Sequence, residues 1–428
     1  MTLDPRAWSD ALSDALGATV APDARPATRI TFDSRQVNAT TAFAALKGEH
    51  AHGNDFIPAA LELGAPFVLT DSDVPRAVRV IDATVALRCW ARLWRDSSGA
   101  SLIGVTGSAG KTTAKELIAA ALEVSCTPGS LNTLNYLATY LLSDVNPNSQ
   151  HVIEMGIDRI GEMNELMALI APDIGVITSI GPAHLEFLGS LEAIAFEKGQ
   201  ILRASEGFVS SGIAWRYPEQ PSYGFDAHAT YRGHDLEHTD SSSSFTYAGQ
   251  RVTIVSPSHK VAEASVLALA LAERFGMPLQ AAIQRLERVA IPGGRMRIER
   301  GRYTLIDDTY NANPLSVTAA LETLERQKGR KIAVLGDMRE LGPDAPLYHR
   351  EIGAIAARAA QQLITVGEHA EDYISGAQGA GLDGLAFTNA DDATTALLTL
   401  LEPDDVVLVK GSRAVGLERV AEVLRARL

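Results

Sequence analysis

The sequence has few cysteines, a deficit of basic residues and no long apolar run. Its two cysteines, Cys89 and Cys126, exclude a disulfide framework and a thiolate metal cluster. Polar residues interrupt every stretch of about 18 residues, the length that a membrane-spanning helix needs. The opening residues MTLDPRAWSD lack the basic and apolar segments of a secretory signal. We therefore expect a cytoplasmic protein that inserts into no membrane.

The charge balance restricts the class of ligand. The chain carries 38 lysines and arginines against 52 aspartates and glutamates, a formal net charge of -14. Because nucleic-acid binding usually needs a basic face, we expect small-molecule substrates and no nucleic acid. An anionic ligand must then be held locally, by a few Lys or Arg side chains and by backbone N–H groups.

Apolar runs alternate with helical patterns along the 428 residues, which predicts an α/β protein of three domains. Residues 1–98, with the short runs FVLTD and AVRVID, form a small α/β domain in this interpretation. Residues 99–291 contain the runs SLIGVTG, HVIEMG and DIGVITSI, typical of a parallel doubly wound sheet. Within them, residues 241–255 predict a hairpin or excursion, with a mobile linker at residues 241–244 as the alternative. After a Pro-Gly-Gly break, residues 292–428 resume the alternation with YTLIDD, KIAVLGD, QLITVGE and VVLVKGS.

The stretch VTGSAGKTT, residues 105–113, follows a predicted strand and precedes a predicted helix. Backbone N–H groups of such a turn point outward at the positive end of a helix dipole and bind polyphosphate. Lys111 would reach the outer phosphates, and the hydroxyl of Thr112 would ligate Mg²⁺. The usual pattern has a glycine where this chain has Val105, so a tight turn without a ligand is the alternative. We interpret the stretch as an ATP site.

Polar residues stand at the ends of other predicted strands, where an open α/β sheet places its ligand groups. Glu154 and His184 are at such positions, which favours metal binding over the simpler interpretation of solvated loop residues. In the third domain, the stretch LIDDTYNANP places several carboxylates and amides together at a strand end. Polar residues also stand at the ends of other predicted strands of this domain, namely Asp337, Lys410 and Arg413. Two sheets with such edges predict a cleft between domains.

Six motifs occur in the order GVTGSAGKTT, IEMGIDRIGEM, APDIGVITSIGPAHLEFLGSLEAIAFEKGQIL, DDTYNANP, VLGDMRELG and VLVKGSR. In these motifs the sequence resembles the Mur ligase family, whose own phosphate loop has the shifted glycine. Residues 31–71 resemble that family's uridine-nucleotide-binding domain, so the resemblance covers nearly the whole chain. The motif DDTYNANP is typical of the branch that adds D-alanyl-D-alanine, and the Asp-Asn-Pro-Arg signature of the branch adding a diamino acid is absent.

The resemblance implies the three-domain Mur ligase architecture: a small N-terminal UDP-binding α/β domain, a central P-loop-type parallel-sheet ATPase domain and a C-terminal Rossmann-like α/β domain. It also implies a reaction. ATP would phosphorylate the terminal carboxylate of UDP-N-acetylmuramoyl-tripeptide, and the amine of D-alanyl-D-alanine would displace phosphate from the acyl phosphate. This step belongs to cytoplasmic peptidoglycan precursor synthesis, and thereby to cell-wall biogenesis, cell shape and cell division. We expect a monomer that uses ATP and Mg²⁺ at two sites.

The resemblance also implies roles for particular residues. Thr112 and Glu154 would serve one Mg²⁺, and His184 and Lys198 the second, once CO₂ has converted Lys198 into an anionic carbamate. A plain lysine paired with Glu197 or another carboxylate is the alternative. The implied catalytic residues are Lys111, Glu154, His184 and Lys198. The implied ATP contacts are Gly107, Ser108, Ala109, Gly110, Lys111, Thr112, Thr113, His259, Arg295, Asp308 and Asn311, and the implied substrate contacts are Ser34, Arg35, Tyr310, Asn313 and, as weaker matches, Arg413 and His349.

The sequence departs from the family pattern in three segments, and two other functions stay open. Thr133 and Tyr136 stand where the branch usually has asparagine and glycine near the peptide carboxylate. Lys260 and Glu263 replace asparagines near the adenine, and Gln200 replaces a glutamate. The alternatives are another ATP-dependent amide ligase of the superfamily, such as a folylpolyglutamate synthase, and a non-catalytic nucleotide-binding regulator. We further expect ligand binding to close a hinge at the IPGG stretch.

Overall fold

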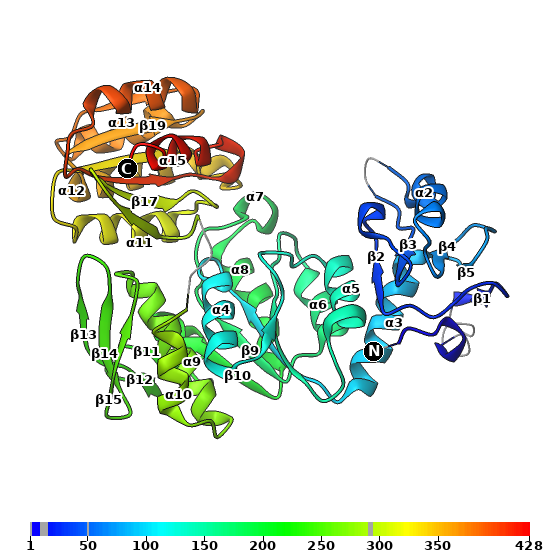
Figure 1. Cartoon of the computed structure of the whole chain (residues 1–428). Coiled ribbons are helices and arrows are strands. Elements are labelled where there is room, and N and C mark those ends of the chain that lie inside the picture. Colours follow the sequence, from blue (N-terminus) through cyan, green and yellow to red (C-terminus); the bar gives the residue numbers. More distant parts are fainter. Residues whose placement is uncertain (1, 9–15, 49–50, 290–293) are drawn as a thin grey trace. The chain divides into compact units, whose positions relative to one another are not determined.

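The computed structural model describes residues 2–8, 16–48, 51–289 and 294–428. It divides into two compact units, each built from several stretches of chain. The first contains residues 1–104, 130–156 and 163–174, and the second contains residues 105–129, 157–162 and 175–428. Figure 1 labels the helices and strands of both. The described helices include none that is both long enough and apolar enough to cross a membrane.

The N-terminal part of the first unit is a five-stranded sheet in the order β1-β5-β4-β3-β2. β1 pairs antiparallel with β5, and the other neighbours are parallel. Both predicted strand runs are confirmed, FVLTD as β4 and AVRVID as β5. The elements are β1 (Thr19–Val20), β2 (Arg29–Thr31), η1 (Ser34–Gln36), β3 (Thr41–Ala44), η2 (Gly53–Phe56), α2 (Ile57–Glu62), β4 (Val68–Thr70), β5 (Ala77–Arg79) and α3 (Ala83–Ser98).

Later stretches of the chain complete this first unit. They include α5 (Leu134–Asp144), β8 (Gln150–Glu154) and α6 (Glu162–Ile170). Asp144 at the end of α5 makes two hydrogen bonds with the guanidinium of Arg29, at 2.7 and 2.9 Å. Arg95 of α3 donates to the carbonyls of Ile170 and Ala171 and to the carboxylate of Asp173. Segments distant in sequence therefore fasten the N-terminal sheet.

The central sheet has seven strands in the order β12-β11-β10-β9-β6-β8-β7, and β10, β11 and β12 pair in parallel. The predicted strand runs SLIGVTG, HVIEMG and DIGVITSI are confirmed as β6, β8 and β9. The strands of the central sheet are β6 (Ser101–Thr106), β7 (Ser125–Cys126), β8, β9 (Ile174–Ile177), β10 (Glu206–Ser210), β11 (Ser222–Gly224) and β12 (Tyr231–Arg232). The accompanying helices are α4 (Lys111–Leu122), α7 (Leu185–Leu188), α8 (Leu191–Gly199), η3 (Gln200–Arg203), η4 (Ser211–Arg216), α9 (His259–Arg274) and α10 (Leu279–Leu286).

A three-stranded antiparallel sheet follows β12, made of β13 (His234–His238), β14 (Ser243–Tyr247) and β15 (Gln250–Ile254). The prediction of a hairpin in residues 241–255 is confirmed by the β14–β15 pairing. Ser243, which the alternative placed in a linker, is buried and donates to the carbonyl of Ser256 at 2.6 Å.

The C-terminal sheet has six strands in the order β16-β17-β21-β18-β19-β20. β16 is antiparallel to β17, and the remaining pairs are parallel, as the four predicted runs require. The strands are β16 (Arg297–Arg300), β17 (Thr304–Asp308), β18 (Lys331–Gly336), β19 (Gln362–Val366), β20 (Gly384–Phe387) and β21 (Val406–Lys410). The helices are α11 (Pro314–Glu325), η5 (Gly342–Asp344), α12 (Ala345–Ala359), α13 (Ala370–Gly379), α14 (Ala390–Leu400), η6 (Arg413–Val415) and α15 (Glu418–Arg425).

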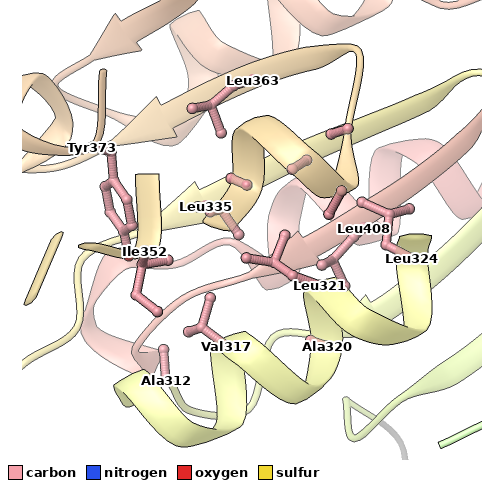
Figure 2. Packing of buried hydrophobic residues seen from close by; sticks show 14 of the residues in the cluster. Ala312, Val317, Ala320, Leu321, Leu324, Leu335, Ile352, Leu363, Tyr373 and Leu408 are labelled. Atoms are coloured by element: carbon pink, nitrogen blue, oxygen red, sulfur yellow. The ribbon is translucent and has the colours of Figure 1, made fainter. Parts of the chain in front are cut away.

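Successive residues of these strands point to opposite faces of the sheet, so each strand serves two apolar clusters. Leu408 packs with α11, α12 and α13, whereas Val407 and Val409 pack with α14 and α15. Figure 2 shows Val317 and Leu321 of α11 pointing toward the strand residues of the first cluster. These helices and strands make a rigid support for the loops at the carboxyl ends of the strands.

The three-domain α/β interpretation agrees with this arrangement of sheets. The first predicted boundary, at 98 and 99, falls where α3 ends and Gly99 takes a left-handed φ of 63°. The second, at 291 and 292, lies outside the described residues, as do the first three residues of the expected IPGG hinge. The exact boundaries remain predictions.

Candidate functional site

The glycine-rich loop joins β6 to α4, as the sequence predicts. Gly107 has φ 153° and Gly110 has φ 83°, values that L side chains rarely adopt. A Cβ atom on Gly107 would lie 2.0 Å from the hydroxyl oxygen of Thr178, so no side chain fits there. α4 begins directly at Lys111, whose Nζ donates to the carbonyl of Gly107 at 2.8 Å. The loop therefore presents backbone N–H groups at a helix N-terminus, the geometry that binds phosphate.

Residues that follow β9 hold this loop in place. Thr178 Oγ1 donates to the carbonyl of Ala109 at 2.6 Å, and Ser179 Oγ accepts from the Ala109 N–H at 2.8 Å. Ser108 Oγ and the backbone of Gly181 bond to one another at 2.8 and 3.0 Å. The sequence analysis missed Thr178 and Ser179, although their place at a strand exit was the available signal.

A second lysine of α4 has a different environment. Lys115, one helical turn after Lys111, is fully buried. Its Nζ donates to the carbonyls of Thr127 and Gly129 at 2.5 and 2.6 Å and lies 3.2 Å from a carboxylate oxygen of Glu116. Lys115 therefore fixes the segment that leaves β7.

The two predicted ligands of the first metal are both oxygen donors with little exposed surface. Thr112 lies in the first turn of α4. Glu154 ends β8 in the first unit and accepts a hydrogen bond of 3.1 Å from the side-chain amide of Asn132. Gly156 allows this contact, because a Cβ atom there would lie 2.4 Å from the same amide nitrogen.

His184 precedes α7 and has a left-handed φ of 55°. Its Nδ1 lies 2.5 Å from Oε2 of Glu340, in the loop after β18. The adjacent His184 imidazole lowers the pKa of Glu340, with burial acting in the opposite direction. The sequence analysis quoted the motif VLGDMRELG but did not single out Glu340.

Lys198 lies near the end of α8 and is only 1% exposed. Its Nζ makes no hydrogen bond in the described part of the chain, and neither does Oε2 of Glu197. The alternative of a lysine paired with Glu197 is therefore not what the structure has. Burial, followed by repulsion from Lys111, holds the pKa of Lys198 well below its ordinary value, with Glu162 acting in the opposite direction. Both the burial and the neighbouring cation thus favour the neutral amine over the ammonium.

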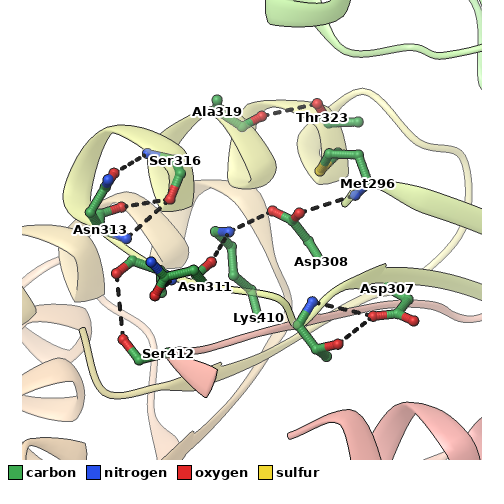
Figure 3. A network of polar contacts seen from close by, with 12 residues as sticks. Met296, Asp307, Asp308, Asn311, Asn313, Ser316, Ala319, Thr323, Lys410 and Ser412 are labelled. Carbon is green, nitrogen blue, oxygen red and sulfur yellow. Dashed lines mark hydrogen bonds and ion pairs between the residues drawn. The ribbon is translucent and has the colours of Figure 1, made fainter. Parts of the chain in front are cut away.

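The motif LIDDTYNANP joins β17 to α11 and brings several predicted residues together (Figure 3). Asp308 accepts from the backbone N–H of Met296 at 3.0 Å and pairs with Nζ of Lys410 at 2.6 Å. Lys410 also donates to the carbonyl of Asn311 at 2.8 Å. β17 and β21 are parallel neighbours in register at Asp308 and Lys410, and this pairing places the carboxylate and the ammonium side by side.

Two predicted arginines lie on Tyr310. The guanidinium carbon of Arg295 is 3.7 Å from the centre of the ring, and that of Arg413 is 5.8 Å away. Cations over an aromatic face at these distances are attracted by its quadrupole. The structure therefore gathers three of the predicted contact residues.

Asn313 connects this motif to the phosphate loop. Its side-chain nitrogen donates to the carbonyl of Ser108 at 2.9 Å, and its side-chain oxygen caps α11 by accepting from the Ser316 N–H. Residues 205 positions apart in the chain thus meet at one loop. No sequence pattern predicts this contact.

Ser34 and Arg35 form η1 in the first unit. The carboxylate of Asp33 caps this turn and pairs with the exposed Arg35 guanidinium at 2.8 Å. Asp337, noted at a predicted strand end, and His349, a weaker match of the resemblance, both have hydrogen-bond partners nearby. His349 is buried, accepts from the Met338 N–H and donates to the Ala345 carbonyl, and Asp337 is buried and accepts from the backbone of Glu368 and His369.

The segments that depart from the family pattern have defined partners. Nζ of Lys260 pairs with Glu263 at 2.7 Å, and Glu263 also accepts from Ser210. The ring of His259 lies 5.5 Å from that of Phe225. Thr133 precedes α5, Tyr136 lies within it, and the amide of Gln200 donates to the carbonyl of Phe196.

Among residues 2–8, 16–48, 51–289 and 294–428, no three His, Cys, Asp or Glu side chains lie close enough together to form a metal site.

Comparisons with known proteins agree with the motifs. The Mur ligase family catalytic domain matches residues 26–124, the Mur ligase middle domain residues 105–266, and the Mur ligase glutamate ligase domain residues 294–413. The UDP-N-acetylmuramoyl-tripeptide–D-alanyl-D-alanine ligase of Bacillus subtilis is 32% identical over 92% of this chain and 92% of its own length. The MurF structure from Acinetobacter baumannii has a TM-score of 0.87 at 25% identity and covers 97% of this chain and 98% of its own. MurF ligase from Thermotoga maritima in complex with ADP has a TM-score of 0.81 at 27% identity, with 93% and 96% covered.

Proposed function

The chain belongs to the Mur ligase family, and we propose that it uses ATP to join D-alanyl-D-alanine to UDP-N-acetylmuramoyl-tripeptide. The relatives that share about a third of its residues over nearly its whole length have this activity in their names. The observation that carries the proposal is the contact of Asn313 with Ser108, because it joins the DDTYNANP motif to the phosphate loop. We place the reaction in the cytoplasm, in peptidoglycan precursor synthesis, and infer a monomer.

The reaction has two steps and needs no protein nucleophile. A carboxylate oxygen of the tripeptide attacks the γ-phosphorus of ATP, the bond to ADP breaks, and an acyl phosphate forms. The amine of D-alanyl-D-alanine then attacks the acyl carbon, loses a proton, and phosphate leaves with its electron pair. Lys111 contributes a positive charge beside the transferred phosphoryl group, and the N–H groups of the loop bind its oxygens.

Oxygen donors suited to Mg²⁺ are present at the positions that the resemblance assigns to the first ion. The Thr112 hydroxyl and the Glu154 carboxylate would hold it. His184 and Lys198 would hold the second. A bound Mg²⁺ neutralises charge on the phosphate oxygens.

Lys198 fits a metal site only in a modified form, since an ammonium repels a cation. The neutral amine is the form that reacts with CO₂, and the burial of Nζ without a hydrogen-bond partner favours that form. A bond forms between Nζ and the carbon of CO₂, one proton is lost, and the product is a carbamate anion. That anion supplies the oxygen ligand that an unmodified lysine lacks.

The remaining site residues divide between the substrates. The nucleotide would contact the loop residues, His259, Arg295, Asp308 and Asn311. Tyr310, Asn313 and Arg413 would form the surface for the incoming dipeptide, and Ser34 and Arg35 would bind the uridine nucleotide. The cation–ring cluster around Tyr310 supports this assignment.

Phosphate release from ATP tests the proposal directly. We expect release only with both UDP-N-acetylmuramoyl-tripeptide and D-alanyl-D-alanine present, with a product heavier by the dipeptide in mass spectra. Hydrolysis by the protein alone, unaffected by either substrate, would contradict it. Ligation of glutamate to a folate would support the folylpolyglutamate synthase alternative, which the relatives do not favour. Binding of ATP without any ligation would support the regulator.

A further inference from the structure

His184 and Glu340 come from elements more than a hundred residues apart and make a close contact. Oε2 of Glu340 lies 2.5 Å from Nδ1 of His184, and the carbonyl of Glu340 accepts from the Glu186 N–H at 3.1 Å. Gly342 lies against the same turn, where a Cβ atom would be 3.5 Å from the Cα of Glu186. Through its side chain and its backbone carbonyl, Glu340 thus holds the loop after β18 against the start of α7.

Both partners have an unfavourable backbone conformation. His184 has φ 55° and Glu340 has φ 64°, and neither is a glycine. Such a conformation costs about 1 kcal/mol or more for each residue, and it persists only where the surroundings impose it. The packing around this contact therefore holds both residues in conformations that they would rarely adopt in an unconstrained loop.

The contact determines which ring nitrogen carries the proton. An ionised carboxylate has no proton of its own, and an approach of 2.5 Å leaves no room for two facing lone pairs, so the proton lies on Nδ1 of His184, although the contact lacks the alignment of a full hydrogen bond. In the neutral ring, Nε2 then keeps its lone pair, and this is the tautomer that can bind a metal ion. Histidines that bind metals commonly donate their other N–H to a carboxylate, which orients the ring.

We propose that Glu340 is a positioning residue that fixes the tautomer and orientation of His184. The inference rests on the proposed function for the role of His184 as a metal ligand. Glu340 belongs to the loop after β18, whereas His184 follows β9. His184 is therefore held in the tautomer that binds a metal ion only while the loop after β18 contacts the start of α7. Because both side chains are partly exposed, at 27% and 43%, water competes and the effect is moderate.

The tautomer can be measured without metal or turnover. The full chain is labelled with ¹⁵N-histidine, and the signals of His184 are assigned by their loss in His184→Gln. We expect the Nδ1–H tautomer in the unmodified protein and a shift toward Nε2–H in Glu340→Ala. Glu340→Gln should keep the Nδ1–H form, because its amide oxygen still accepts. Glu186→Gln removes one charge at an exposed neighbouring residue and should leave the tautomer of His184 unchanged.

A predominant Nε2–H form in the unmodified protein, or unchanged signals in Glu340→Ala, would overturn the proposal. The second arm measures Mn²⁺ binding by electron paramagnetic resonance, with a non-hydrolysable ATP analogue and no peptide substrate. We expect about tenfold weaker binding in Glu340→Ala and nearly unchanged binding in Glu340→Gln. Equal binding in Glu340→Ala and the unmodified protein would contradict an action through the metal. If the unmodified protein binds no Mn²⁺, the metal assignment of the proposed function fails, and the tautomer measurement alone decides the role of Glu340.

Discussion

The side-chain amide of Asn313 donates to the carbonyl oxygen of Ser108 at 2.9 Å while the oxygen of the same amide caps α11. One residue thus starts a helix and touches the phosphate loop. The donor function needs the amide nitrogen, and the cap needs only the oxygen. The two roles can therefore be separated by substitution.

Asn313→Asp keeps the cap, because aspartate and asparagine cap helices equally well. It removes the donor and places a carboxylate beside the loop that binds anionic phosphates. We expect the KM for ATP to rise about tenfold, from the loss of roughly 1 kcal/mol of hydrogen bonding and added repulsion, with the melting temperature nearly unchanged. Asn313→Ala, the control, should lose about 1 kcal/mol of stability as well. An unchanged KM for ATP in Asn313→Asp would contradict the role of the Asn313 amide in positioning the phosphate loop.

Lys111→Ala tests the phosphate loop. The charge that stabilises the transferred phosphoryl group is deleted, so kcat should fall by about 10²–10³-fold, measured as phosphate release with both peptide substrates. Lys328→Ala makes the same deletion at an exposed position and should leave kcat unchanged. Near-normal turnover by Lys111→Ala would mean that the loop does not hold the reacting phosphate.

Lys115→Met should lower stability. The substitution removes the donor to the buried carbonyl of Thr127 and to the carbonyl of the exposed Gly129, and it leaves the buried end of the side chain without its charge. The expected loss is about 2–4 kcal/mol in urea unfolding. Lys111→Met, one turn earlier on α4, removes the donor to the Gly107 carbonyl at a less buried position and should cost less than Lys115→Met. Equal losses from the two substitutions would show that Lys115 has no special structural role.

Lys198→Ala tests the carbamate. We expect ligation to fall to nearly nothing and formate or acetate to restore part of it, because a small carboxylate can occupy the vacated ligand position. The same anions should restore nothing in Lys111→Ala, where the missing group is a cation. Full activity in Lys198→Ala without added anion is incompatible with the proposal, as is formate rescue of both variants.

His238 makes stability depend on pH. Burial, followed by the charges of Arg326 and His259, lowers the pKa of His238 from 6.5 to about 4. Between these values the unfolded chain binds the extra proton and the folded chain does not, so stability falls as the pH falls from about 6.5 toward 4. After allowance for solvent screening at this half-buried site, the loss is on the order of 1–2 kcal/mol.

His238→Gln should remove that part of the pH dependence, measured by urea unfolding at pH 7 and pH 5. His228→Gln, at an exposed position, should leave the pH dependence as it is. If the free energy of unfolding changed equally between pH 7 and pH 5 in the unmodified protein and in His238→Gln, the lowered pKa of His238 would be contradicted.

Much of the fold could be predicted from local pattern. Continuous apolar runs predicted the buried parallel strands, because both faces of such strands are covered. The glycines of the phosphate loop were recognisable because Gly107 and Gly110 adopt backbone angles that other residues avoid. Asp308 ends β17 and Asn311 comes shortly after it, so the sequence already placed them near one another, and Lys410 contacts both.

Contacts between distant segments could not be predicted. A single sequence does not show that Ser108 meets Asn313 or that His184 meets Glu340, because sheet pairing and domain packing bring them together. The resemblance gave His349 as a weaker match, but no sequence pattern showed that its buried ring bonds to the Met338 N–H and the Ala345 carbonyl. Burial and partner identity depend on three-dimensional packing, which periodicity does not contain.

The discontinuous first unit has a consequence for how the chain folds as it is made. Arg29 and Arg95 find their partners in residues 144 and 170–173, which are synthesised well after the N-terminal sheet. Ribosomes add about 5–20 residues each second. The N-terminal sheet therefore emerges several seconds before the segments that fasten it, and during that interval the nascent chain depends on β1 to β5 and α3 alone.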